Sequence, residues 1–300
     1  LGGSIALVAG NNVIASGGTG YTTYAKVGHG GYVPSTTTAL SSIAASPISV
    51  KATTGDVLLL SGTASYTGAK IGHGDHFLKL SSFGESSVDV TAGRHIRLVS
   101  PQFETFTNIV YSGTQIGHGG FGAIVGTIPS TLGYSGYIDV DAGGKIDILA
   151  GKNSGSYNWS LFGHTSYYKS TGNHTGDITV HAGTVAGLDE YGVTVRGASG
   201  TFLPLAGTNS GIGSYYSFAS IGHRGHSNAT ATYSTGLSGD ILVDVIRGGL
   251  RLEGGDGVDG STLATTPPDI RLNGAQIGHG GYSAGHLTYG MHGSVRVHVQ

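Results

Sequence analysis

A short phrase in which a histidine follows a glycine recurs six times along this sequence of 300 residues. Imidazole can bind a metal, exchange a proton near neutral pH, or form hydrogen bonds through both ring nitrogens. The six copies read AKVGHGGY (25–32), AKIGHGDH, TQIGHGGF, SLFGHTSY, ASIGHRGH and AQIGHGGY, and their histidines are His29, His73, His118, His164, His223 and His279. Either the chain carries six copies of a reactive site, or a scaffold needs this phrase once per repeat.

Metal binding and catalysis both fit the phrase poorly. A structural zinc ion takes four ligands, and the shared phrase contains no cysteine, aspartate or glutamate. An active site is a single asymmetric cluster, whereas this histidine returns in every repeat. We therefore expect the six histidines to be structural, and we expect no catalytic residue, no metal and no cofactor.

Carboxylates are weaker candidates for chemistry. A pair of them on a groove could cleave polysaccharides, as on other β-helix enzymes. GGDGVDG (254–260) is similar to a calcium-binding turn, but it occurs once and cannot complete a site between two repeats. TGD and SGD openings, which contain two of the aspartates, are typical of solvated turns. The six aspartates at polar positions of predicted strands are Asp89, Asp139, Asp141, Asp177, Asp240 and Asp244.

The composition indicates a β-protein with many tight turns. Glycine contributes 56 of the 300 residues and charged residues only 11%, against about 7% and about 25% in ordinary domains. A net charge of −2 offers no basic face for nucleic acid. Cysteine is absent, and no apolar run reaches the roughly 18 residues of a membrane-spanning helix.

The histidine phrase belongs to a longer repeat. The six histidines follow one another at intervals of 44, 45, 46, 59 and 56 residues, and two other phrases lie between them in constant order. Segment A has the copies PISVKA (47–52), SVDVTAG (87–93), YIDVDAG (137–143), GDITVHAG (176–183), GDILVDV (239–245) and GSVRVHV (293–299). Segment B has the copies GDVLLLSG (55–62), HIRLVSP (95–101), KIDILAG (145–151), YGVTVRG (191–197) and GLRLEGG (249–255), and we assign SIALVAG (4–10) as its first copy.

All three segments alternate apolar and polar residues with period two, which is typical of strands with one buried face. No single repeat can bury its apolar face alone, so stacking A on A, B on B and C (the histidine phrase) on C predicts a parallel β-solenoid. We expect one domain over 1–300, with about six turns of roughly 45–60 residues, three strands per turn and variable loops. The predicted repeats are 1–46, 47–86, 87–136, 137–175, 176–238 and 239–292, with 293–300 starting the next.

Two other architectures remain open at this point. A β-propeller also has repeats of about 40–45 residues, but each blade needs four antiparallel strands. Alternatively, each repeat could form two smaller turns of a solenoid. The chain begins and ends within strand-like phrases, so we expect it to be a window from a longer array.

The same alternation places the histidine ring. His279 is in phase with Ala275 and Ile277, so it faces inward unless the flanking glycines turn it outward. Inward rings would stack in a column, with pKa values lowered by burial and mutual repulsion. We expect the residues on the opposite face of segment C to meet water; they are Lys26, Lys70, Gln115, Ser220 and Gln276.

Tyrosines, of which there are 16, crowd the loops beside segment C. A flat ring with a polar tip suits contact with carbohydrate or protein, and it also suits covering of glycine-rich backbone. The candidate contact residues are Tyr21, Tyr24, Tyr167, Tyr168, Tyr215 and Tyr216.

The phrases GDITVHAG, GGKIDILAG and AQIGHGGY resemble the repeat region of filamentous-haemagglutinin-like adhesins of the two-partner-secretion type. The resemblance covers the whole chain and implies a right-handed parallel β-helix. It also implies a non-enzymatic adhesive segment of a large bacterial fibre, located at the cell surface or outside the cell. The family's amino-terminal secretion domain is not in this sequence.

The resemblance further implies self-association, end to end or laterally, and contact with host or surface glycans or proteins through the loops. Nucleic acid and a membrane span within this window are not expected. Two other functions remain open, a self-assembling sheath or filament subunit and a polysaccharide-acting β-helix enzyme of the lyase or tailspike kind.

Overall fold

The structure is a computed structural model of the chain. It describes residues 2–30, 41–74, 80–103, 112–120, 133–152, 158–167, 173–197, 200–201, 203–204, 211–212, 217–226, 236–255, 257–258, 274–280 and 291–300.

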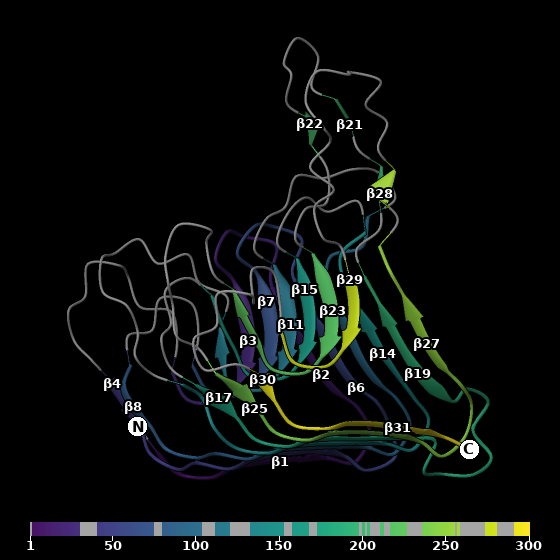
Figure 1. Cartoon of the computed structure of the whole chain (residues 1–300), viewed down its shortest axis with the longest axis horizontal. Coiled ribbons are helices and arrows are strands. Elements are labelled where there is room, and N and C mark those ends of the chain that lie inside the picture. Colours follow the sequence, from purple (N-terminus) through teal and green to yellow (C-terminus); the bar gives the residue numbers. More distant parts are fainter. Residues whose placement is uncertain are drawn as a thin grey trace.

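Three large sheets dominate the described part of the chain, and every strand pair within them is parallel (Figure 1). Sheet A contains β1 (Ile5–Ala9), β5 (Ile48–Ala52), β9 (Val88–Ala92), β13 (Ile138–Ala142), β18 (Ile178–Ala182), β26 (Ile241–Val245) and β31 (Val295–Val299). Sheet B contains β2 (Val13–Ser16), β6 (Val57–Leu60), β10 (Ile96–Val99), β14 (Lys145–Leu149), β19 (Gly192–Arg196) and β27 (Leu250–Glu253). Sheet C contains β3 (Tyr24–Val27), β7 (Gly68–Ile71), β11 (Gly113–Ile116), β15 (Trp159–Phe162), β23 (Phe218–Ile221) and β29 (Gly274–Ile277).

Smaller sheets extend from these three. Two of them have three parallel strands each, β12 (Gly119–Gly120) with β16 (Thr165–Tyr167) and β24 (Arg224–His226), and β17 (His174–Thr175) with β25 (Leu237–Ser238) and β30 (Met291–His292). The two-stranded sheets are β4 (Ser41–Ile43) with β8 (Leu80–Phe83), β20 (Gly200–Thr201) with β28 (Gly257–Val258), and the antiparallel pair β21 (Leu203–Pro204) and β22 (Gly211–Ile212). The described residues contain no helix, so none could span a membrane as a helix.

The chain passes through sheets A, B and C in the same order in each repeat, and each strand pairs with its counterpart one repeat later. The register does not shift within the large sheets; Ile138 pairs with Val88 on one side and with Ile178 on the other. The predicted all-β fold with parallel sheets is confirmed. The propeller is wrong because its blades need antiparallel neighbours. Two smaller turns per repeat are also wrong, because each repeat contributes one strand to each sheet.

One segment assignment is wrong. SIALVAG contains β1, which pairs with β5 in sheet A and not with the copies of segment B. The first strand of sheet B is instead β2, which pairs with β6. Period-two alternation cannot distinguish A from B. The spacing could have done so, because Ile5 precedes Val13 by the same eight residues that separate Val88 from Ile96.

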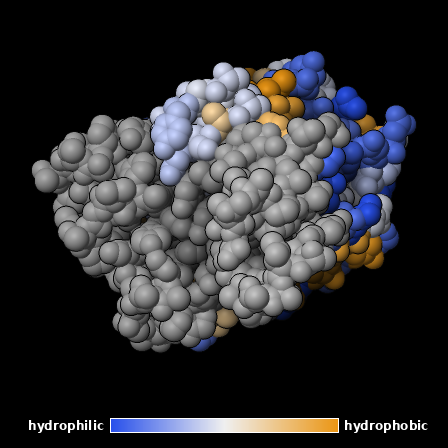
Figure 2. Space-filling model, turned by 90° about the horizontal axis from the view of Figure 1, so that it is seen from above, coloured by the Kyte–Doolittle hydropathy of each residue, from blue (hydrophilic) through white to orange (hydrophobic). Residues whose placement is uncertain are grey.

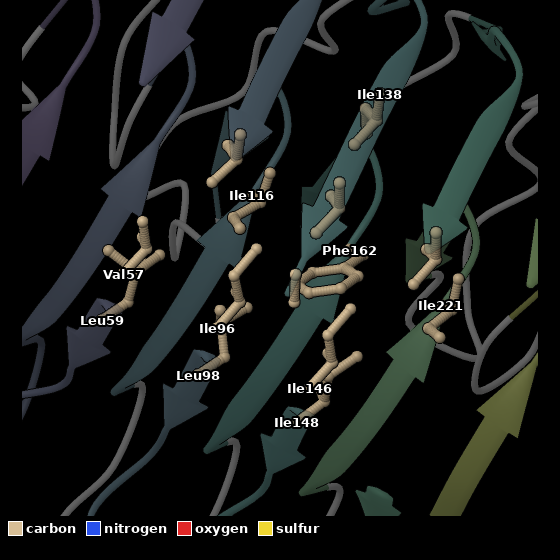
Figure 3. Close-up of a cluster of buried hydrophobic side chains, with 14 of the residues drawn as sticks. Val57, Leu59, Ile96, Leu98, Ile116, Ile138, Ile146, Ile148, Phe162 and Ile221 are labelled. Atoms are coloured by element: carbon tan, nitrogen blue, oxygen red, sulfur yellow. The ribbon is translucent and has the colours of Figure 1, made fainter. Parts of the chain in front are cut away.

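The core fills the space between the three sheets, and each repeat supplies it with equivalent residues. Figure 3 shows the inward side chains of Val57 and Leu59 beside Ile96 and Leu98 of the next repeat. Full burial of one such aliphatic side chain stabilises a fold by about 1.5–3 kcal/mol. On the outside, hydrophobic residues lie in patches among hydrophilic ones (Figure 2).

Candidate functional site

The six histidines of the repeated phrase form one column, and each of them lies two residues after the end of a sheet C strand. Successive rings are stacked with centroids 5.0, 5.1, 4.8, 4.6 and 4.9 Å apart, and neighbouring planes differ by at most 19°. The two end rings, His29 and His279, are partly exposed. The four central rings are fully buried on the same side as the apolar residues of the strand, and they belong to His73, His118, His164 and His223.

One ring nitrogen joins each turn to the next. The backbone N–H of His73 donates to Nδ1 of His118 at 3.0 Å, and the N–H of His118 donates to Nδ1 of His164 at 3.0 Å. The same bond links the remaining neighbours at 2.9–3.1 Å. Each Nδ1 therefore acts as an acceptor and carries no hydrogen.

The other ring nitrogen closes each turn on itself. Nε2 of His118 bonds the carbonyl oxygen of Ser86, which lies two residues before the sheet A strand of the same repeat, at 2.6 Å. The other five rings bond the equivalent carbonyls at 2.5–2.8 Å, namely those of Gly3, Ser46, Gly136, Gly176 and Gly239. A carbonyl can only accept, so Nε2 carries a proton in all six rings, and the neutral Nε2–H tautomer is fixed in the five rings whose Nδ1 also accepts, from His73 to His279.

The glycine before each histidine permits the close approach of successive turns. A Cβ atom on Gly72 would lie 1.8 Å from the carbonyl oxygen of Gly117, and one on Gly222 would lie 2.0 Å from that of Gly278. Their φ angles of 150° and 146° also favour glycine. In the Gly–His pair, the glycine thus allows the backbones of successive turns to approach closely, and the histidine ring forms a hydrogen bond between these turns.

Burial lowers the pKa of the central rings. The pKa of His73 falls from 6.5 to about 4, chiefly through desolvation and with a contribution from the neighbouring His29. Desolvation likewise holds the pKa of His118, His164 and His223 well below 6.5, and adjacent rings of the column add to the effect. At neutral pH these imidazoles are uncharged, as the two hydrogen bonds require.

Two further histidines join turns elsewhere, and the sequence analysis missed both. Nδ1 of His174 accepts a hydrogen bond from the backbone of Tyr134 at 3.1 Å, and desolvation lowers its pKa to about 3. Nδ1 of His95 accepts from the backbone of Lys145 at 3.0 Å. Each occurs in one repeat only, so no periodicity marks it.

Two of the candidate aspartates have the same kind of role. The backbone N–H of Asp240 donates to Oδ1 of Asp177, and the N–H of Ser294 donates to Oδ1 of Asp240, both at 2.8 Å. The TGD and SGD openings therefore join successive turns. The hydrogen bonds from Ser294 lower the pKa of the Asp240 carboxyl.

The other four candidate aspartates lie on the outer face of sheet A. Asp89 and Asp139 are direct neighbours in register, and burial is the main cause of the raised pKa of both carboxyls. Asp141 accepts a hydrogen bond from Thr184, and Asp244 lies 3.8 Å from the ring of His181. Among the described residues no three such side chains converge to hold a metal ion. Positions 256 and 259 of the GGDGVDG turn lie outside the described residues.

The candidate tyrosines are only partly described. Tyr21 is 66% exposed, and its ring lies 4.9 Å from that of Tyr66 in the next repeat. Tyr24 is also exposed, and Tyr167 lies in β16. Tyr168, Tyr215 and Tyr216 lie outside the described residues.

The expectation that the outer face of segment C meets water is wrong for three of the five residues named for it. Lys70, Gln115 and Ser220 are buried. The long side chains bond backbone carbonyls instead of water: Nζ of Lys70 donates to Gly74 at 3.1 Å, and Nε2 of Gln115 donates to His118 and Gly163 at 3.0 and 2.9 Å. Alternation identifies the outward side but does not show whether that side is covered.

Comparison with protein-family models, curated proteins and solved structures finds no match to this chain.

Proposed function

We propose that the chain is a right-handed parallel β-solenoid of about six turns, and that it forms a non-enzymatic structural and adhesive segment of a large extracellular bacterial surface fibre. In this reading it is a relative of the filamentous-haemagglutinin-like adhesins, whose repeats its phrases resemble. The regular A, B, C order of parallel strands supports the solenoid. A crossover between parallel strands is right-handed in about 98% of cases, which supports the handedness.

The observation that carries the structural role is the use of both ring nitrogens by five of the six column histidines, all except the end residue His29. In these five, Nδ1 accepts from the neighbouring turn and Nε2–H donates within its own turn, so neither nitrogen is left to bind a metal or to move a proton for a substrate. The histidine that recurs in every repeat therefore holds neighbouring turns together. A scaffold that must be long needs such a bond once per turn.

The adhesive part of the proposal rests on exposed tyrosines beside sheet C. Tyr21 and the neighbouring Tyr66 present two rings 4.9 Å apart, a pairing suited to the flat faces of sugars or to a protein surface. The proposed partners are host or surface glycans and proteins, together with further copies of the chain.

Adhesion can be tested with beads that carry the purified chain. We expect them to bind host cells more than albumin-coated beads do. Tyr21→Ser combined with Tyr24→Ser should reduce binding several-fold. Tyr137→Ser should not, because Tyr137 is also exposed, at 50% against 66% for Tyr21 and 36% for Tyr24, but lies beside sheet A. Binding no greater than that of albumin beads would contradict the adhesive role.

A further inference from the structure

A cationic side chain lies on the outer face of sheet C, and no carboxylate in the described part of the chain neutralises it. The guanidinium carbon of Arg224, in the fifth copy of the histidine phrase, is 3.5 Å from the ring centroid of Phe218. Arg224 is partly buried, and Phe218 is 8% exposed. Within the described part of the chain, no carboxylate pairs with this guanidinium, and desolvation alone lowers its pKa to about 9.

A second polar group without a hydrogen-bond partner lies on the same face. Ala219 and Ile221 of β23 belong to the core, so alternation places Phe218 and Ser220 on the opposite side of the strand. Ser220 is fully buried, and its Oγ is one of the few buried side-chain atoms in the described residues that make no hydrogen bond. It lies about 6.6 Å along the strand from Phe218, at a rise of about 3.3 Å per residue.

The Arg224 guanidinium and the Ser220 hydroxyl would both be stabilised by a negatively charged hydrogen-bond acceptor. A desolvated cation is costly unless a negative charge neutralises it, and stacking on an aromatic ring offsets only part of the cost. A buried hydroxyl without a partner is also unfavourable and could donate to an acceptor. A planar guanidinium matches the two oxygens of a carboxylate or sulfate group.

We propose that the outer face of β23 is a binding site for an oxyanion, a carboxylate or sulfate group held by the Ser220 hydroxyl and by the guanidinium of Arg224, which itself lies over the ring of Phe218. The group can be a free ion or part of an acidic sugar. A sugar-borne group would give the proposed surface fibre a ligand of defined chemistry, but the site does not depend on that function.

The chain contains its own reporter for this site. Trp159 is the single tryptophan of the sequence and is the register partner of Phe218 in the adjacent strand β15. The full chain, in low-salt buffer, is titrated with sodium sulfate and with a uronic-acid oligosaccharide. Sodium chloride at equal ionic strength and a neutral oligosaccharide are the controls.

We expect a saturable change in Trp159 emission that the controls do not produce. Arg224→Gln should weaken the apparent affinity at least about tenfold, and the exposed Arg296→Gln should leave it unchanged. Saturation by sulfate alone identifies a free ion as the ligand, and saturation by the oligosaccharide identifies a sugar-borne group; both support the site. No saturable change, or an equal change in Arg224→Gln, overturns it.

Thermal melting separates binding from packing. In low salt Arg224→Met should melt at or above the wild-type temperature, because it removes an uncompensated charge, and it should lose the rise in melting temperature that the anion causes. Ser220→Ala should fold and bind several-fold more weakly. A constant drop in the melting temperature of Arg224→Met at every anion concentration, together with unchanged binding by Ser220→Ala, would make Arg224 a packing residue and refute the proposal. Neither outcome bears on adhesion through Tyr21.

Discussion

Mild acid should loosen the fold through the histidine column. Each central ring must remain neutral, because Nδ1 accepts a backbone hydrogen bond and cannot do so once protonated. In the unfolded chain the same histidines titrate near pH 6.5. Their folded pKa is lowered, so their contribution to stability is present above pH 6.5 and is lost progressively as the pH falls towards the folded value, which is about 4 for His73.

The magnitude follows from linkage. At pH 5 the unfolded state gains about 2 kcal/mol from protonating one histidine of pKa 6.5, whereas a ring with a folded pKa of about 4 gains almost nothing. His73 and His174, whose folded pKa values are about 4 and about 3, together lose about 4 kcal/mol, and the other three central rings of the column, whose pKa values burial also lowers, add to this loss. A loss of this size is a large part of the stability of a typical domain, which is about 5–15 kcal/mol. The raised pKa values of Asp89 and Asp139 act in the opposite direction, because protonation of these carboxyls favours the folded state.

Urea unfolding at pH 7.5 and pH 5.0, followed by circular dichroism and by Trp159 fluorescence, measures this loss. His118→Asn is the matched variant, because the Asn158 side chain already accepts a backbone N–H from the preceding repeat in a neighbouring column. The variant should be less stable at pH 7.5, since it loses the bond to Ser86, and its free energy of unfolding should fall less between pH 7.5 and pH 5.0 than that of the wild type, because the lowered pKa of His118 no longer contributes. Equal unfolding free energies of the wild type at the two pH values would refute the reasoning.

Two other predictions concern glycine and the core. Gly222→Ala places a Cβ 2.0 Å from the carbonyl oxygen of Gly278 and should lower the free energy of unfolding by more than about 3 kcal/mol. The control Gly254→Ala has open space around it and should lower the free energy of unfolding by less than about 0.5 kcal/mol. Comparable losses for the two variants in urea unfolding would contradict the steric role. Ile148→Ala should cost about 2–5 kcal/mol, and Ile14→Ala, at 61% exposure, should have little effect; a small loss at Ile148 would show that the core can collapse around the gap.

Much of the fold could be predicted because the repeat shows the same pattern several times. Alternation such as Ile178, Val180 and Ala182 identifies a strand and its buried side, and the histidine follows from the same parity. Alternation does not identify the sheet to which an isolated strand belongs, so SIALVAG was placed in B instead of A. Likewise, Lys70 and Gln115 were expected in water because the pattern carries no information about what covers the outer face.

The candidate sites show the same limit. The column could be found because the same Gly–His phrase returns once in every repeat, whereas His95 and His174 each occur in one repeat only. Arg224 and Ser220 likewise interrupt the repeat, where ASIGHRGH has residues found in no other copy. Periodicity identifies the residues that recur in every repeat, whereas the role of a residue present in one repeat can be recognised only from its contacts in the structure.

The two bonds of each imidazole explain how the repeat tolerates insertions. Histidine intervals vary from 44 to 59 residues, yet the rings remain 4.6–5.1 Å apart and the strands keep their register. Because Nε2 bonds the start of the sheet A strand of its own turn and Nδ1 bonds the backbone of the preceding turn, the spacing is set at the corner and not by loop length. An insertion between β19 and β23 therefore adds chain outside the column without straining it, at an entropic cost that grows only slowly with length. Such a corner allows each turn to carry a different loop on a constant scaffold, which is what a surface that varies its contacts requires.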